Sequence, residues 1–413
     1  MTDRPVRLGL RENAPQFALL VAITAFVGAM VGLERSTLPL VGRDDFGLSS
    51  SVAVLSFIVA FGLSKALTNL AAGALAERAG RRRLLIGGWV IALPVPVLIA
   101  LAPSWAFIVA ANVALGVNQG LTWSMAVVMK VDLVGPRRRG LALGLNEASG
   151  YLGVAVAATA SGLLAAEFAA RDVLVVAGLA VALTALALSV LFARDTSAHV
   201  ALEQAGHAPR RDGRPPDLGE AFADATYRVP ALRSCSQAGL VNNLNDGVAW
   251  GLVPLFLAAN GAGVSAIGLV AGLYPAVWGI AQVGTGAWSD RAGRKPLIVA
   301  GMLLQALALA VLATSQGDVP VAALAAVMLG AGTALVYPTL IAAISDHVTP
   351  IVRAPTIGVY RFWRDMGYVA GGLVAGLAAD AISFAAAIGL VAALTALSGL
   401  WVALDLPARS GAA

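Results

Sequence analysis

The sequence predicts an all-α membrane protein with about twelve transmembrane helices arranged as two related halves. Of its 413 residues, 59% are hydrophobic and only 12% are charged, whereas a soluble domain carries roughly 25% charged residues. A set of glycines and charged residues in the first half also recurs at a nearly constant spacing in the second half. A water-soluble protein of this length needs a polar face on most of its helices, and this composition does not supply one.

Apolar segments of about 20 residues recur along the chain, and that length crosses a hydrocarbon core of roughly 30 Å. The first segment follows Arg4, Arg7 and Arg11 and is too long for the apolar region of a signal peptide, so we expect an uncleaved helix. We predict spans at residues 16–40, 52–76, 84–102, 105–130, 140–165, 172–193, 232–258, 265–288, 296–315, 320–345, 354–378 and 382–404.

Arginine and lysine gather in every second connection, which predicts that both termini are cytoplasmic. The opposite connections hold only Arg43 and Arg171. The clustered residues are Arg4, Arg7, Arg11, Arg78, Arg81, Arg82, Arg83, Arg137, Arg138, Arg139, Arg291, Arg294, Lys295 and Arg353. The net charge of +5 therefore reflects membrane topology, and we expect no nucleic-acid partner.

Residues 194–231 differ in composition from the rest of the chain. The run from Arg210 to Asp217 is polar, of mixed charge and rich in proline and glycine, which is typical of a mobile cytoplasmic linker. The sequence thus divides into an N-terminal six-helix half (1–193), a linker (194–231) and a C-terminal six-helix half (232–413). A plain tether is the simpler interpretation of the linker, with a regulatory role as the alternative.

The two halves repeat one another after even-numbered spans. Gly73, Glu77, Arg78, Gly80 and Arg81 match Gly286, Asp290, Arg291, Gly293 and Arg294, which lie 213 residues later. Further along, Asp132, Pro136 and Arg139 match Asp346, Pro350 and Arg353, which lie 214 residues later. Chance similarity between apolar helices does not preserve charged residues and prolines in this way, so the chain contains an internal repeat.

With this doubled loop motif the sequence resembles the major facilitator superfamily over essentially its whole length. Glu77 departs from the aspartate that is usual in the family but keeps the charge. The resemblance implies two six-helix bundles in the bacterial inner membrane, related by an axis along the membrane normal. It also implies a substrate site near mid-membrane between the bundles, and transport by rocking of one bundle against the other.

The loop motif suggests a cytoplasmic gate. Its glycines allow tight turns, and Asp132 and Asp346 are natural partners for the nearby arginines. We expect such ion pairs to latch the cytoplasmic side when the protein faces outward, the alternative being that they only fix topology. The gate residues are Gly73, Glu77, Arg78, Gly80, Arg81, Asp132, Gly286, Asp290, Arg291, Gly293, Arg294 and Asp346.

Several charged residues lie inside predicted spans, where each costs about 2.5 kcal/mol or more. Arg361, Arg364, Asp365 and Tyr368 share one helix face by their spacing. We therefore expect the charged and neighbouring polar residues to face a central substrate and proton cavity. They are Glu34, Arg35, Lys65, Asn69, Glu147, Asn242, Asp246, Arg361, Arg364, Asp365 and Tyr368.

Glu147 and Asp246 have no obvious partner in their own helices, and we expect them to carry protons, since buried carboxyl groups exchange protons near neutral pH. Glu147 and Arg361 are equivalent in the repeat and carry opposite charges, so we expect them to face one another. The alternative is that the buried charges form silent ion pairs. Lys130, at a helix end, is expected to reach the membrane interface.

Two transport functions remain open. The first is proton-coupled efflux of a small organic compound, although Gly150-Tyr151 replaces the Gly-Pro of the family's antiporter motif. The second is proton-coupled symport or exchange of a small organic anion, which the four cations inside predicted spans, Arg35, Lys65, Arg361 and Arg364, favour. Motifs for ATP binding and hydrolytic catalysis are missing, so an enzyme is not expected. We expect no cofactor, no metal and a monomer; the single cysteine, Cys235, excludes an internal disulfide.

Overall fold

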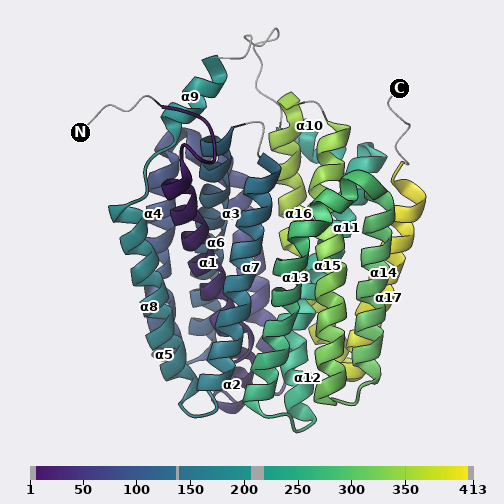
Figure 1. The fold of residues 1–413 in the computed structure, drawn as a ribbon. Helices are drawn as coiled ribbons and strands as arrows, with labels where there is room; N and C mark the ends of the chain where they lie inside the picture. The colour runs from purple at the N-terminus through teal and green to yellow at the C-terminus, as the bar shows by residue number, and fades with distance from the viewer. Residues whose placement is uncertain (1–5, 136–138, 206–217, 349, 408–413) are drawn as a thin grey trace.

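The computed structural model describes residues 6–135, 139–205, 218–348 and 350–407. These residues form long, nearly parallel helices and contain no strand (Figure 1). Nine of the described helical segments are long and apolar enough to cross a membrane. The remaining long segments of the described chain are α7, α11 with α12, and α16, and these carry Glu147, Asp246 and the Arg364–Asp365 pair. Apolarity alone therefore does not identify the helices that carry these buried charges.

Each half contains six long helical segments. Two segments of the N-terminal half and one segment of the C-terminal half are each divided into two helices. The N-terminal half comprises α1 (Ala14–Arg35), α2 (Leu38–Asp44), α3 (Ser51–Ala79), α4 (Arg81–Ala92), α5 (Pro94–Ala100), α6 (Trp105–Val134), α7 (Arg139–Leu164) and α8 (Ala170–Leu191). The C-terminal half comprises α11 (Pro230–Gly247), a π-helical turn (Val248–Leu252), α12 (Val253–Ala259), α13 (Val264–Ala292), α14 (Arg294–Thr314), α15 (Val319–His347), α16 (Pro350–Ala381) and α17 (Phe384–Asp405).

The spans predicted from the sequence are confirmed, because each segment begins and ends within about four residues of its expected limits. The sequence does not predict where the segments divide. Pro39 stands near the start of α2, Pro94 at the start of α5 and Pro254 near the start of α12. Proline lacks a backbone donor and clashes with the preceding turn, which explains the division of these segments at the prolines.

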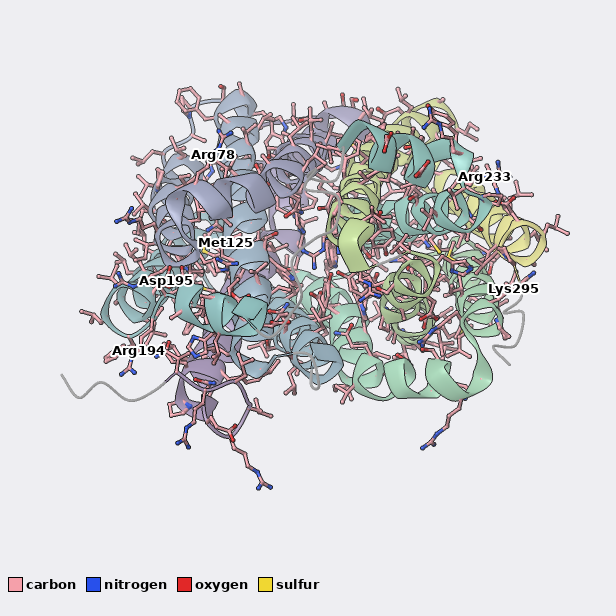
Figure 2. All side chains as sticks on the ribbon, turned by 90° about the horizontal axis from the view of Figure 1, so that it is seen from above. Arg78, Met125, Arg194, Asp195, Arg233 and Lys295 are labelled. Carbon is pink, nitrogen blue, oxygen red and sulfur yellow. The ribbon has the colours of Figure 1, made fainter. Side chains whose placement is uncertain are left out.

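The two halves lie side by side, as the view from above shows (Figure 2). Within the described chain, α7 packs against α13 and α3 packs against α16, so these four helices form the boundary between the halves. One continuous apolar core runs through both halves. Both termini lie at the same end of the molecule, which we call the terminus end, and we call the other the closed end (Figure 1).

At the closed end the halves touch through glycines. A Cβ atom added to Gly162 of α7 would lie 2.5 Å from the Cα of Gly268 of α13. Similarly, a Cβ on Gly376 of α16 would lie 2.7 Å from the Cα of Val52 of α3. Such backbone approach is possible only without a side chain, so the small residues bring both boundary pairs into direct contact.

A carboxylate reinforces this contact. Asp380 of α16 accepts hydrogen bonds from Ser50 Oγ at 2.7 Å, from the backbone N–H of Ser51 at 2.5 Å and from that of Val52 at 3.1 Å. These donors belong to the first turn of α3, where backbone N–H groups have no partner within the helix. Asp380 of one half therefore caps a helix of the other half.

The linker contains more structure than its composition suggests. Within residues 194–231 the chain forms α9 (Ser197–Ala205), α10 (Leu218–Ala223) and a π-helical turn (Asp224–Arg228). The polar run from Arg210 to Asp217 lies outside the described residues. Partial burial raises the pKa of Asp195, but hydrogen bonds from Ser197 and from the backbone of Arg82 outweigh this effect and lower it.

We predict that Gly162→Leu destabilises the protein, because the added side chain must push α13 away from α7. Overpacking of this kind costs about 1–3 kcal/mol. Gly144→Leu, in the same helix, is the control, since no described atom lies within 4 Å of a Cβ placed there. Thermal unfolding of both variants in detergent measures the difference. Equal melting temperatures for the two variants would contradict the close approach of the halves.

Candidate functional site

Glu147 of α7 lies at the boundary and is held by neutral donors. Its Oε1 atom accepts hydrogen bonds from Trp123 Nε1 and from Asn146 Nδ2, both at 3.0 Å. Its Oε2 atom accepts one from the hydroxyl of Tyr337 at 3.1 Å. Tyr337 belongs to α15, so this last bond crosses from one half to the other. Glu147 forms no ion pair with any described residue.

A second crossing bond lies between α3 and α16. Arg364 and Asp365 form an ion pair, with Nη2 and Oδ1 at 2.6 Å. Asp365 also accepts a hydrogen bond from Asn69 Nδ2 at 2.5 Å, and Asn69 Oδ1 accepts one from Ser124 Oγ at 2.8 Å. Because Asn69 lies on α3, this bond also joins the two halves.

The two crossings close into a ring. Arg364 Nη1 donates to the hydroxyl of Tyr337, which donates to Glu147. Glu147 in turn is bonded to Trp123, the neighbour of Ser124 in α6. The ring thus passes through α6, α3, α16, α15 and α7 and back to α6. We call these side chains, Trp123, Ser124, Asn69, Asp365, Arg364, Tyr337 and Glu147, the bridging ring.

Asp246 has a different environment, made by phenols of its own half. It accepts hydrogen bonds from the hydroxyl of Tyr274 on α13 and from that of Tyr368 on α16, the latter at 3.3 Å. The Tyr274 hydroxyl also lies 3.2 Å from Thr333 Oγ1 on α15. Asp246 is fully buried. Like Glu147, it is held by neutral donors and forms no ion pair with a described residue.

Arg35 is buried without a hydrogen-bond partner. The side chain is 0% exposed, and none of its three nitrogens is hydrogen-bonded within the described part of the chain. Instead its Cζ atom lies 4.6 Å from the ring centre of Phe61, 5.4 Å from that of Trp250 and 5.7 Å from that of Phe57. A desolvated cation–π contact contributes about 2 kcal/mol or more, and these three contacts oppose the several kcal/mol that burial of an ion costs.

Lys65 is similar. Its Nζ atom lies 5.4 Å from the ring centres of Phe61 and Tyr368 and 5.6 Å from that of Trp123. The side chain is only 6% exposed and forms no hydrogen bond or ion pair with another described residue. Phe61 is therefore flanked by two cations that form no ion pair with any described residue.

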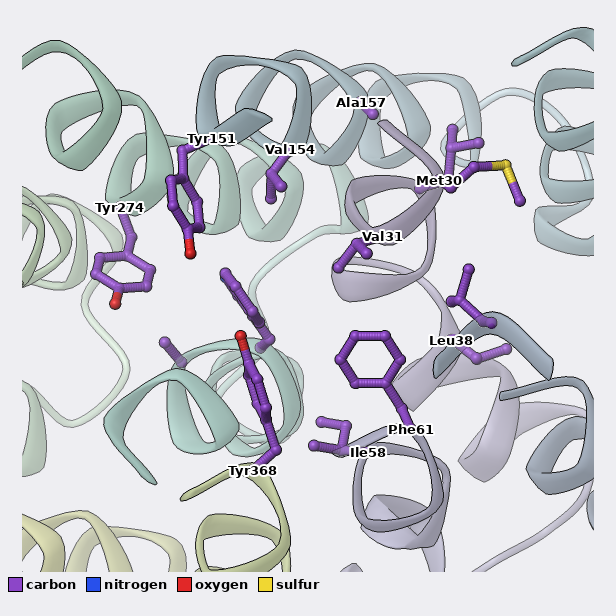
Figure 3. Close-up of a cluster of buried hydrophobic side chains, with 14 of the residues drawn as sticks. Met30, Val31, Leu38, Ile58, Phe61, Tyr151, Val154, Ala157, Tyr274 and Tyr368 are labelled. Atoms are coloured by element: carbon purple, nitrogen blue, oxygen red, sulfur yellow. The ribbon is translucent and has the colours of Figure 1, made fainter. Parts of the chain in front are cut away.

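Aromatic rings line the boundary around these charges. Phe61 meets Tyr368 at 5.6 Å between ring centres, and Tyr368 stacks on Trp250 at 5.8 Å. Figure 3 shows Phe61, Tyr151, Tyr274 and Tyr368 converging from different helices. From Trp250 the contacts continue through Tyr274, Trp278 and Tyr151 to Trp123 and Tyr337. We call this set of rings the aromatic seam.

A cavity of about 550 Å³ leads to the bridging ring. It lies between α7 of one half and α13 and α15 of the other. Its lining runs from Glu147 and Tyr337 to Arg294 and Ser345, near the terminus end. No described atom lies within 4 Å of a Cβ placed on the lining residues Gly144 and Gly286, so the halves stand apart here. This volume suits a small organic molecule.

The repeated loops have matching geometry in both halves. Gly80 and Gly293 end their helices at φ values of 85° and 88°, a conformation that favours glycine. Arg81 Nε lies 2.7 Å from Asp132 Oδ2, and Arg294 Nε lies 3.1 Å from Asp346 Oδ2. The expected ion pairs are therefore present, and each of these two lies within one half rather than between halves.

Other gate residues contribute less to the described structure. Arg78 and Arg291 are exposed and form no ion pair with a described residue. The surroundings of Gly73, Glu77 and Asp290 lie outside what the structure describes. Asp132 also accepts a hydrogen bond from Thr196 Oγ1 at 2.5 Å, which attaches the start of the linker to the N-terminal gate.

Three sequence-based expectations are corrected. Arg361 does not face Glu147 as an ion-pair partner. Arg364, one turn further along α16, reaches Glu147 through Tyr337 instead. Asn242 accepts a hydrogen bond from Gln305 of α14 at 3.0 Å, a contact within the C-terminal half. Lys130 does not extend to the interface: it is fully buried and donates to Leu20 O at 3.0 Å and to Thr24 Oγ1 at 2.6 Å.

The remaining expected cavity residues are buried or half-buried. Glu34 is 3% exposed, its Oε2 atom has no hydrogen-bond partner among the described residues, and it forms no direct ion pair with Arg35.

Two residues at the boundary, Tyr151 and Asp380, were not predicted from the sequence. Tyr151 lies one helical turn beyond Glu147, a spacing that indicates a shared face. Asp380 stands at the end of an apolar helix, and its role depends on contacts that the sequence does not indicate.

Comparison with known families now adds to this geometry. The family model described as Major Facilitator Superfamily matches residues 17–230 and 236–413. The chain belongs to the major facilitator superfamily. Its two-bundle architecture with a boundary cavity is thus that of a membrane transporter family whose members move small molecules by secondary transport.

Two bacterial members of the superfamily are similar over most of their length. The uncharacterized MFS-type transporter YddS of Bacillus subtilis (strain 168) is 24% identical over 87% of this chain and 83% of its own. The uncharacterized MFS-type transporter STM4428 of Salmonella typhimurium (strain LT2) is 26% identical over 89% of this chain and 90% of its own. These relatives and the membrane-spanning helices indicate a multi-pass inner-membrane protein.

We predict that Tyr337→Phe lowers the free energy of unfolding by about 2 kcal/mol, because it leaves a buried Arg364 donor without its acceptor. Tyr360→Phe is the matched control. Tyr360 is equally buried, but its hydroxyl has no partner among the described residues. Thermal unfolding of the two purified variants provides the comparison. A Tyr337→Phe variant as stable as Tyr360→Phe would show that the bridging ring does not join the halves.

Proposed function

We propose that this superfamily member is a proton-coupled secondary active transporter that moves a small organic molecule by alternating access. The observation that carries the proposal is the position of Glu147, which ends the cavity and joins the halves through Tyr337. The cavity supplies room for the molecule, and the carboxyl group supplies a site for the proton.

The chemistry of Glu147 suits a proton carrier. Trp123, Asn146 and Tyr337 donate to it, and all three are neutral. A proton can therefore bind to or leave Glu147 without leaving a cation unpaired. Asp365 differs, because protonation there would leave the buried Arg364 without its counter-ion. Asp246, held by two phenols, is the second candidate carrier.

Protonation also affects the contact between the halves. When Glu147 is ionised, the hydroxyl of Tyr337 donates to a charged acceptor, and such bonds are roughly twice as strong as neutral ones. Protonation removes that charge and weakens one of the two crossing bonds of the bridging ring. Loading of the proton thus favours separation of α7 from α15, which couples proton movement to rearrangement of the halves.

The closed end supplies the opposing gate. The described halves touch there and stand apart around the cavity at the terminus end, so this conformation opens toward the termini. With both termini placed in the cytoplasm, as the arginine pattern predicts, the cavity faces inward. In the outward-facing state Asp380 separates from α3, and the loops with Arg81–Asp132 and Arg294–Asp346 approach one another as the latch.

Efflux of a small organic compound and symport or exchange of a small organic anion both fit this mechanism. The unpaired Arg35 and Lys65 favour the anion, because an uncharged cargo leaves both buried cations without compensation. Proteoliposomes with pH gradients imposed in either direction test the proposal. A panel of labelled organic anions and lipophilic cations is offered, and movement of at least one compound must follow the gradient.

We predict that Glu147→Gln abolishes the response to a pH gradient while preserving exchange of labelled for unlabelled cargo. Glutamine retains the shape and most hydrogen bonds of the side chain but cannot take up the proton. Glu167→Gln, at an exposed position, is the control and should behave as the wild type. Gradient-driven uptake that persists in Glu147→Gln and stops in Asp246→Asn would assign proton coupling to Asp246 instead.

We further predict that Asp380→Ala makes the closed end open more often, because α3 loses a cap supplied by the other half. A cysteine at position 55, on the buried face of α3, should then react faster with a water-soluble maleimide. Asp318→Ala is the matched control, since Asp318 caps Val321 of its own half at 2.9 Å. Faster labelling in both variants, or in neither, would exclude Asp380 from the closed-end gate.

A further inference from the structure

Two buried cations at the boundary between the halves form no ion pair with any described residue. Arg35 and Lys65 flank the ring of Phe61, at 4.6 Å and 5.4 Å from its centre. Neither forms a hydrogen bond or an ion pair with another described residue. Glu34 acts on Arg35 and Asp365 acts on Lys65 electrostatically, but without a direct ion pair. A direct hydrogen-bonding partner for either cation is therefore missing from the described part of the protein.

The other two buried cations of the described chain have direct partners. Arg364 is paired with Asp365 and bonded to Tyr337. Lys130 donates to a backbone carbonyl and to Thr24. Arg35 and Lys65 differ from both in lacking such a partner among the described residues.

The surroundings of the two cations restrict what the missing partner can be. Phe57, Phe61 and Trp250 surround Arg35, while Phe61, Trp123 and Tyr368 surround Lys65. Aromatic faces bind planar apolar groups well, through offset-stacked or edge-to-face contacts. A small hydrated anion would leave these faces in contact with water.

Lys65 does not line the cavity but lies just beyond its inner end, behind Trp123 and Glu147. The cavity ends at Glu147, and Trp123 both donates to Glu147 and lies beside the Lys65 ammonium. Arg35 lies on the Phe61 side, covered by Trp250 of the other half. Separation of the halves at the closed end would remove Trp250 and uncover Arg35. The two cations thus serve the two sides of the boundary.

We propose that the cargo is an organic anion with an aromatic body, whose ring packs in the aromatic seam and whose acidic group binds Lys65 from the cavity side and Arg35 once the halves separate at the closed end. This assignment rests on the proposed transport function, since it takes the cavity and seam as the cargo site. It narrows the cargo from small organic molecules to aromatic carboxylates and related acids.

Binding to the purified full-length protein tests the assignment without a proton gradient. The probes are 2-naphthoate, its neutral amide 2-naphthamide, and acetate, an acid without a ring. We expect 2-naphthoate to raise the melting temperature and to bind at least about tenfold more tightly than either other probe. Equal binding of 2-naphthamide, or no binding of 2-naphthoate, would overturn the assignment.

Variants locate the binding groups. Arg35→Gln and Lys65→Gln should each lose the preference for the acid over the amide, whereas Arg35→Lys and Lys65→Arg should retain part of it. Arg233→Gln is the control, because it makes the same chemical change at an ion pair with Asp405 away from the boundary. An unchanged preference in both glutamine variants would place the acid elsewhere and overturn the assignment.

This experiment separates the two proposals. Binding of 2-naphthoate without gradient-driven transport would support the cargo class and contradict proton coupling. Gradient-driven transport of lipophilic cations, with no 2-naphthoate binding, would support the transport mechanism and overturn the cargo class. If the glutamine variants do not fold, the wild-type comparison of acid with amide and the charge-preserving variants still decide the question.

Discussion

The structure depends on how buried polar groups are satisfied where the two halves meet. Within a bilayer no water pairs with a side chain, so each charged group requires a partner from the protein or from a bound molecule. In the bridging ring, Glu147, Arg364 and Asp365 meet this requirement through hydrogen bonds and an ion pair with residues of both halves. The charges therefore join the halves, and any change of charge within the ring alters that junction.

The kind of contact between the two halves changes along their boundary. At the closed end, glycines and the Asp380 cap bring backbone against backbone. In the middle, the bridging ring and the aromatic seam join the halves through side chains. At the terminus end the cavity separates them. In the proposed alternating-access cycle, a hinge movement about the middle layer would open one end as it closes the other, and side-chain contacts tolerate such rotation better than close backbone packing does.

Much of the architecture follows from local sequence patterns. The spans, the repeat and the Arg81–Asp132 and Arg294–Asp346 pairs depend on apolar length and on charges a short distance apart, which the sequence displays directly. The buried charges of the boundary are also predictable, because a charge inside a span must face protein or water. The partners of these charges cannot be predicted from the sequence, because they depend on how each helix is rotated and tilted.

The repeat suggests that Arg361 lies opposite Glu147, yet the orientation of α16 presents Arg364 to Tyr337. The position of Lys130 at a helix end suggests the interface, but free acceptors on α1 bury it.

The hydrogen bond between Thr196 and Asp132 makes the two halves unequal despite their repeat. The chain that connects the halves is fastened to the N-terminal half at its first residues, beside the Arg81–Asp132 pair. Near its other end the linker is held to the C-terminal half, where Trp363 Nε1 of α16 donates to Thr226 Oγ1 at 2.9 Å. Each half therefore carries its own end of the linker with it when it moves.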